Sequence, residues 1–99
     1  MTEKEIERHF CQKIRRQGCL TWKLTSPQNP GIPDRLIITP KGEVWFVEFK
    51  SANGRLSNFQ RHIIAELTDR GTNAKILCSR HDAEIFAEEL LKGGDVGRI

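Results

Sequence analysis

Three charged residues stand at the ends of the most hydrophobic stretch of the sequence, GIPDRLIITPKGEVWFVEFKS at residues 31–51. Asp34 opens one apolar run, and Glu48 and Lys50 close the next. An unpaired charge is costly to bury, so a fold keeps charges at such places only where something compensates them. Two carboxylates and an ammonium group are side chains with which a protein can bind a divalent cation and act on a phosphate group.

The turn between the two apolar runs predicts how these charges face one another. Thr-Pro-Lys-Gly at residues 39–42 is typical of a type I turn followed by a bulge, which makes the flanking runs an antiparallel hairpin. Asp34 and Glu48 are equally far from Lys41 in the chain. The sequence therefore predicts that they lie opposite each other, within the one residue by which a bulge can shift the register. Glu48 and Lys50, two positions apart on a strand, point to the same face.

Facing carboxylates repel unless one takes up a proton or a cation lies between them. Hard oxygen ligands favour Mg²⁺ or Mn²⁺ over zinc, and the backbone carbonyl of Phe49 is a further candidate ligand. Lys50 is placed to orient a water molecule or to stabilise charge on a pentacovalent phosphate. The alternative interpretation is two cross-strand ion pairs at an exposed strand end.

Two polar residues on predicted helices are further candidates. Taking about 100° per residue, Glu7 lies about 100° from Ile6, at the margin of the apolar stripe, and is a candidate metal or water ligand unless it is a surface glutamate. Glu3 also faces inward, but it belongs to the first turn, where the helix dipole favours an acid. Gln60 lies at the edge of the stripe of the second helix, where it could hold a water or a catalytic carboxylate. Ser57-x-x-Gln60 is equally a capping box.

The basic residues favour a polyanionic partner. Residues 1–81 contain 14 Lys and Arg against 8 Asp and Glu, whereas residues 82–99 contain 2 against 5. A basic body with an acidic C-terminal helix is compatible with nucleic acid on one face. Lys23, Arg35 and Arg55 are candidate phosphate contacts, although each is equally explained as a solvated surface charge. Neither a nucleotide-binding glycine loop nor a nucleophile motif is present, and the histidines and cysteines lack metal-ligand spacing.

The periodicity predicts three helices and four strands. Helices are expected from about residue 3 to 17, from the cap at Ser57 to Gly71, and from 81 to 92; strands are expected at 19–24, 34–39, 43–50 and 74–78. The fold class is α/β, a mixed central sheet flanked by helices in the order α-β-β-β-α-β-α. We expect a single domain spanning 1–99, with 93–99 as a loose tail. No membrane span or signal-peptide pattern is found. The three cysteines are widely spaced without a C-x-x-C pair, so a disulfide framework is not expected and a cytoplasmic location is.

These residues together resemble a known family. "GIPD" (31–34), "EFK" (48–50) and "LSNFQ" (56–60), with a glutamate in the first helix, are similar to the VRR-NUC branch of the PD-(D/E)XK nucleases, and more closely to its short stand-alone members from bacteriophages and bacteria. The resemblance covers roughly residues 3–80. It implies a restriction-endonuclease-like core that uses one or two Mg²⁺ or Mn²⁺ ions to hydrolyse DNA phosphodiester bonds, without a nucleotide cofactor.

The resemblance also implies residue roles. Asp34, Glu48 and the Phe49 carbonyl would hold metal, Glu7 would add a direct or water-mediated contact, Lys50 would be the catalytic lysine and Gln60 the glutamine typical of the family. The family commonly has valine at the position of Phe49, but because a backbone carbonyl is the ligand, activity is expected to persist.

The stand-alone members resemble Holliday-junction resolvases, which implies a homodimer cutting branched DNA in a bacterial or phage-infected cell. Two opposed cuts in a four-way junction require two active sites related by a two-fold axis. The 99 residues leave no space for the added DNA-binding domains of larger relatives that cut flaps. The alternatives are a monomeric flap or nicking endonuclease and a non-catalytic junction-binding module. A regulator in a toxin-like or restriction context is also left open by the sequence.

Overall fold

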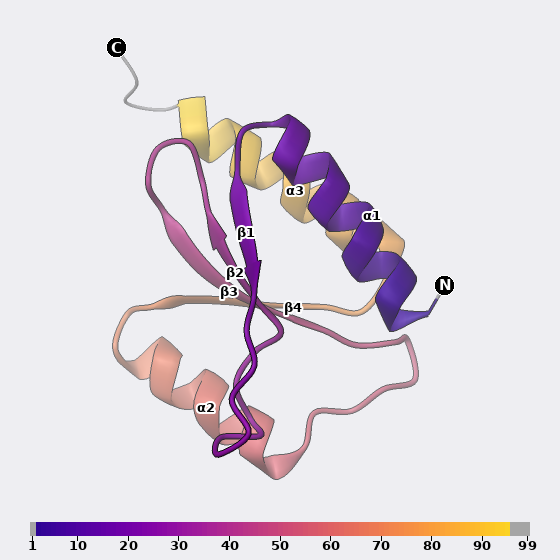
Figure 1. Cartoon of the computed structure of the whole chain (residues 1–99), viewed down its shortest axis with the longest axis vertical. Coiled ribbons are helices and arrows are strands. Elements are labelled where there is room, and N and C mark those ends of the chain that lie inside the picture. Colours follow the sequence, from indigo (N-terminus) through magenta and orange to yellow (C-terminus); the bar gives the residue numbers. More distant parts are fainter. Residues whose placement is uncertain (1, 96–99) are drawn as a thin grey trace.

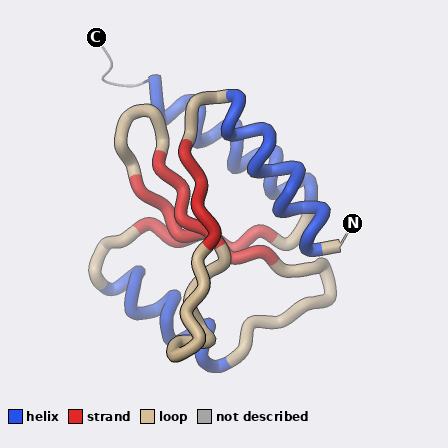
Figure 2. Tube along the Cα trace, viewed as in Figure 1, coloured by secondary structure: helices blue, strands red, loops and turns tan. Residues whose placement is uncertain are grey.

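The computed structural model describes residues 2–95, which form three helices and one four-stranded sheet (Figures 1 and 2). The elements are α1 (Glu3–Arg16), β1 (Leu20–Lys23), β2 (Arg35–Ile38), β3 (Val44–Phe49), α2 (Asn58–Asp69), β4 (Asn73–Leu77) and α3 (Arg80–Asp95). The predicted α/β class and the predicted element order are confirmed. No helix within residues 2–95 is long and apolar enough to cross a membrane.

The first two helices begin at the residues that the sequence predicts. Thr2 and Ser57 are N-caps, and each forms a complete capping box with the residue three positions later. These boxes satisfy backbone N–H groups that would otherwise lack partners. The third helix is longer than predicted: it continues past Lys92 to Asp95. The loose tail predicted from residue 93 is therefore wrong for residues 93–95, and residues 96–99 lie outside the described part of the chain.

The sheet has the strand order β1-β2-β3-β4, in which β3 is an inner strand, as its apolar sequence predicts. β1, β2 and β3 form an antiparallel meander, and β4 pairs with β3 in parallel. The predicted turn is present between β2 and β3, where the N–H of Gly42 donates to the carbonyl of Thr39 at 2.8 Å. Gly42 has a φ of 92°, a left-handed conformation that glycine adopts without steric cost.

Helices α1 and α3 lie side by side on one face of the sheet, and α2 lies across the other (Figure 1). The core fills the space under α1 and α3, where Phe10 and Phe86 stack with their ring centroids 5.8 Å apart. The sheet contributes Ile37, Val47 and Leu77, which are inaccessible to solvent. Each such side chain stabilises the fold by about 1.5–3 kcal/mol. Because residues alternate along a strand, the neighbours of these core residues face α2 or solvent.

The loop from residue 24 to 34 reaches from β1 to the start of α2 and back to β2 (Figure 1). A hydrogen bond of 2.9 Å from the N–H of Leu24 to the carbonyl of Asp34 closes its base. At the far end, Gly31 lies so close to α2 that a Cβ atom there would stand 2.4 Å from the carbonyl oxygen of Phe59. The glycine of the GIPD segment thus permits the loop that ends at Asp34 to rest on α2.

We predict that Gly31→Ala lowers the free energy of unfolding by about 1–3 kcal/mol, because the added methyl group meets backbone atoms that cannot move independently. Urea denaturation measures the change. Gly42→Ala is the comparison, since nothing lies within 4 Å of its Cβ position and its cost is that of placing a side chain at a φ of 92°, without a clash. An unchanged denaturation midpoint for Gly31→Ala would show that the loop does not rest on α2 as described.

Candidate active site

The hairpin brings Asp34 and Glu48 together at the end of the sheet away from the turn. Arg35 pairs with Val47, so the register continued by one residue places Asp34 opposite Glu48, as the turn predicts. Asp34 is further fixed because its Oδ2 accepts a hydrogen bond of 2.9 Å from the N–H of Phe49. Two carboxylates therefore stand at the junction of two rigid strands, and Glu48 is only 3% exposed.

Gln60 connects this pair to α2. Its Nε2 donates to Oε2 of Glu48 at 3.1 Å, while its Oε1 accepts from the N–H of Ser57 at 2.8 Å. Gln60 thus completes the capping box and also contacts Glu48, because the two ends of its amide bind different partners. The cap orients the amide, and the amide orients Glu48.

Lys50 lies on the same side as Glu48, as two-residue spacing on a strand requires. Its Nζ stands 3.9 Å from Oε2 of Glu48, and its side chain is largely buried. The contact is an ion pair without a short hydrogen bond, so the three ammonium protons remain available to a ligand.

Burial raises the pKa of Glu48 to about 7, and the negative charge of Asp34 adds to the shift. Lys50 acts in the opposite direction without cancelling it. A glutamate normally titrates at 4.5, so this carboxyl group holds a proton at a pH where an exposed glutamate is ionised. Without a ligand, the negative charges of Asp34 and Glu48 are not fully compensated by the protein, and a bound cation would reduce their repulsion.

Glu3 is the α1 glutamate that lies beside this site. Its Oε1 accepts a hydrogen bond of 3.2 Å from the N–H of Ser51, and its charge contributes to the raised pKa of Glu48. Sequence reasoning assigned Glu3 to the helix dipole alone. The inward angle of Glu3 on the helix was the signal that pointed to the site.

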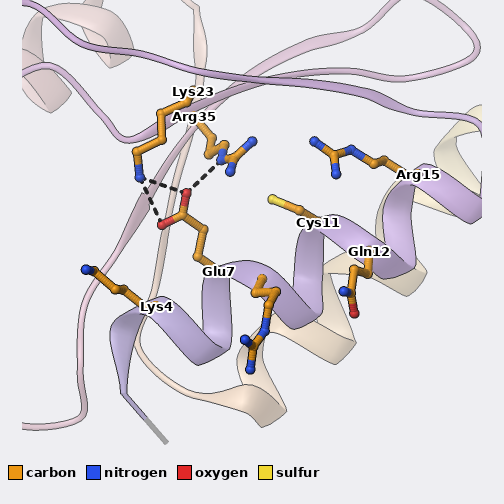
Figure 3. A pocket seen from close by; sticks show the side chains of 8 residues that line it. Lys4, Glu7, Cys11, Gln12, Arg15, Lys23 and Arg35 are labelled. Carbon is orange, nitrogen blue, oxygen red and sulfur yellow. Dashed lines mark hydrogen bonds and ion pairs between the residues drawn. The ribbon is translucent and has the colours of Figure 1, made fainter.

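Glu7, the predicted helix ligand, is held elsewhere. Its Oε2 accepts a hydrogen bond of 2.7 Å from Nε of Arg35, and Nζ of Lys23 lies 3.2 Å from the same oxygen (Figure 3). Arg35 shares the face of Val47, under α1, whereas Glu48 faces the other side of the sheet. Burial would raise the pKa of Glu7, but the hydrogen bonds from Arg35 and Lys23 outweigh it and hold the pKa below its ordinary value.

The three predicted phosphate contacts differ in their surroundings. Lys23 and Arg35 pair across β1 and β2 and share Glu7, although the Lys23 side chain stays more than half exposed. Arg55 is exposed in the loop between β3 and α2. The structure thus brings together Asp34, Glu48, Lys50 and Gln60, places Glu3 with them, and gathers Glu7, Lys23 and Arg35 into a second cluster.

The donor set of the first cluster fits a hard divalent cation. Asp34, Glu48 and the carbonyl of Phe49 could supply oxygen ligands, and the pKa of Glu48 is raised first by burial and then by the negative charge of Asp34. Within residues 2–92, the part of the chain with described side chains, no three side chains of His, Cys, Asp or Glu are grouped closely enough to hold a metal. A cation here would therefore rely on two carboxylates, a backbone carbonyl and water, as Mg²⁺ commonly does.

We predict that the stability of the metal-free protein falls as the pH rises from 5 to 8.5, and that Glu48→Gln removes most of this fall. The folded-state pKa of Glu48, about 7, lies above its unfolded value of 4.5. Protonation therefore favours the folded state, and the stabilisation, on the order of 2 kcal/mol, is lost as the pH rises through 7. Urea denaturation in EDTA at each pH measures the free energy of unfolding. If the wild type and Glu48→Gln lost the same stability over this pH range, the raised pKa of the buried Glu48 would be contradicted.

Comparisons with known proteins identify the family of this chain. The model of the VRR-NUC domain family matches residues 1–81. A protein of Acyrthosiphon pisum secondary endosymbiont phage 1, named "Putative nuclease p44", is 33% identical over 84 residues, which are 85% of this chain and 90% of that protein. A solved structure named as a VRR_NUC domain superposes with a TM-score of 0.81 at 28% identity, covering 87% of this chain and 94% of the other. The chain therefore belongs to the VRR-NUC domain family of nucleases.

Proposed function

We propose that this nuclease domain is a metal-dependent DNA endonuclease that cuts branched DNA, such as four-way junctions, as a homodimer. The observation that carries the proposal is the buried pair of Asp34 and Glu48 beside Lys50. A protein that only bound DNA would gain nothing from two repelling carboxylates next to an ammonium group, because both carboxylates also repel phosphates. A cell infected by phage or a bacterial cytoplasm is the expected location.

Each residue has a role that follows from its surroundings. Asp34, held by the N–H of Phe49, and Glu48, held by Gln60, would bind Mg²⁺ or Mn²⁺, one or two ions, together with the Phe49 carbonyl. When bound, the cation supplies charge stabilisation at the phosphate and activates the attacking water. Lys50 carries three donors on a largely buried stem, so it can hold that water in line or stabilise the charge that develops on the phosphate oxygens.

The dimer and the branched substrate are the finer parts of the proposal. Two opposed cuts in one junction call for two copies of a chain that carries a single site. An apolar row, Leu20, Ile38 and Val44, crosses three strands on the face away from α1, and Trp22 is 55% exposed beside it. Such a patch is a suitable surface for a second copy. A monomeric flap or nicking enzyme would use the same metal-dependent hydrolysis of the phosphodiester bond. A DNA-binding module would bind the junction without hydrolysing it.

We predict paired symmetric cuts in a labelled immobile four-way junction with Mg²⁺ or Mn²⁺, and no cuts in EDTA. Lys50→Ala should lower the cleavage rate by about 100-fold or more, the usual effect of removing a donor that stabilises developing charge. Gel analysis of both strands, beside matched duplex and flap DNA, measures the outcome. Light scattering of the same sample should give twice the 11.4 kDa chain mass.

The outcomes separate the alternatives. Cuts confined to flaps or nicks, by a protein with the mass of one chain, would retain the chemistry and reject the junction-cutting dimer. Tight binding to the junction without cleavage in either metal would reject the endonuclease assignment altogether.

We also predict that Glu3→Gln affects metal-dependent cleavage more than Glu7→Gln does. Glu3 lies beside Glu48 and the strand end, so its loss should raise the Mg²⁺ concentration needed for half-maximal cleavage several-fold. Glu7 is paired with Arg35 and Lys23, so Glu7→Gln should lower the stability by about 1–3 kcal/mol and leave the Mg²⁺ requirement unchanged. Mg²⁺ titrations below the unfolding temperature of both variants measure this. If Glu7→Gln raised the Mg²⁺ requirement and Glu3→Gln did not, Glu7 would be the metal ligand on α1 and this prediction would be wrong.

A further inference from the structure

The second cluster of charged residues lines a pocket of about 270 Å³ between α1, β1 and β2 (Figure 3). Five of its lining residues are cationic, namely Lys4, Arg8, Arg15, Lys23 and Arg35, and among the described residues Glu7 is the one acid that lines it. A water occupies about 30 Å³, so the pocket has room for a phosphate group together with several waters.

Glu7 leaves this pocket strongly positive, because it is already paired. It accepts hydrogen bonds from both Lys23 and Arg35, which share its single negative charge. Arg35 uses its Nε atom for this bond, and the two Nη groups of its guanidinium remain for other acceptors. The carboxylate thus positions two cations at the mouth of the pocket without neutralising both.

The remaining cations come from one side of α1. Lys4, Arg8 and Arg15 are four and seven residues apart, which places them along one stripe of the helix over about 16 Å. Among residues 2–92, whose side chains the structure describes, no carboxylate lies within ion-pair distance of any of the three. Unpaired like charges gathered around a hollow favour an anion with several oxygen atoms.

Arg15 and Arg35 converge on the same point of the pocket. Their guanidinium groups lie on either side of Cys11 in Figure 3, and both charges act on that buried thiol. Two forked guanidinium groups that line one pocket suit a phosphate, which can accept hydrogen bonds from both. A neutral ligand would leave this repulsion uncompensated.

The pocket begins where the candidate active site ends. Arg35 directly follows Asp34, and Lys4 directly follows Glu3, so the Cα atoms of each pair are about 3.8 Å apart. In each pair the acid belongs to the candidate active site and the cation lines the pocket. Because successive residues on a strand point to opposite faces, Asp34 turns to the carboxylate site and Arg35 turns under α1. The two clusters lie on opposite faces of β2 and are adjacent at its start, so a DNA strand that leaves Asp34 and Glu48 would pass the start of β2 to reach Lys4 and Arg35.

We propose that this pocket and the Lys4–Arg8–Arg15 stripe of α1 bind the backbone phosphates of the DNA strand that continues from the cleavage site. The ligand is recognised by charge and not by base, so this part of the interface fixes where DNA lies and adds no sequence preference. The inference rests on the proposed function, in that the same DNA is the substrate. It adds a contact surface on the opposite side of β2 from the cleavage chemistry.

The test is binding of a fluorescent 30-base-pair duplex and a four-way junction to the full chain in EDTA, followed by anisotropy at 50–300 mM NaCl. The variant is Arg8→Gln/Arg15→Gln. The matched control is Lys13→Gln/Arg16→Gln, which removes the same charge from the same helix outside the pocket. We expect the pocket variant to bind about tenfold more weakly or worse, with the slope of log affinity against log salt reduced by about 1–2. The control should change by less than threefold.

Equal losses in the two variants would overturn the proposal, because they would reflect net charge alone. No loss in the pocket variant would also overturn it, and so would preferential binding of an RNA of the same sequence. Cleavage of the junction with Mg²⁺ is measured in parallel. Weaker binding confined to the pocket variant, together with no cleavage by the wild-type chain, would reject the endonuclease and keep the phosphate site, so the two failures are distinguishable.

Discussion

The hydrogen bond from the N–H of Phe49 to Asp34 is the contact on which the site depends. It joins the residue that opens β2 to the backbone of β3, and the register set by the Gly42 turn decides that Glu48 is the residue opposite. One residue of slip would turn Glu48 into the core and bring an apolar side chain to the site. The hairpin is apolar so that it packs rigidly, and its rigidity holds together two carboxylates that repel each other.

Because side chains alternate along a strand, adjacent residues contribute to two different clusters, one acidic and one basic. Asp34 and Arg35 are neighbours in the chain, yet the first contributes to an acidic site and the second to a basic pocket on the other side of β2. The same division occurs at the start of α1, where Glu3 contacts Ser51 and Lys4 lines the pocket. Opposite charges on one face of β2 would pair with each other. Because the two sets lie on opposite faces, each remains available to a ligand.

Local rules predicted the scaffold well, because the signals were local. Two capping boxes, a Thr-Pro-Lys-Gly turn and the period of apolar residues are each read over a few positions, and they gave the element order and the pairing of Asp34 with Glu48. α3 was expected to end earlier because glycines follow Lys92, but the helix continues to Asp95. Gln60 was ambiguous in the sequence for a physical reason: a side-chain amide has two ends, and the structure uses both.

The choice between Glu3 and Glu7 could not be made from helix angles, since both face inward on α1. It depends on what each glutamate meets across the sheet, which is a tertiary fact: Ser51 for Glu3, and Arg35 with Lys23 for Glu7. A carboxylate with two cationic partners is satisfied, whereas one next to Glu48 adds to a charge that is already uncompensated. The acids at the end of β3 thus remain without cationic compensation by the protein, whereas the acid under α1 is paired.

On the flank away from β1 and β2, α1 faces acidic residues of α3. His9 lies 3.8 Å from Glu84 of α3, which also pairs with Arg80. The helix thus carries its unpaired cations on the flank next to β1 and β2, and meets the acidic α3 on the opposite flank. A polyanion that approaches α1 is attracted on the first flank and repelled on the second. The charge asymmetry along the sequence thus becomes, in the fold, a difference between the two flanks of α1.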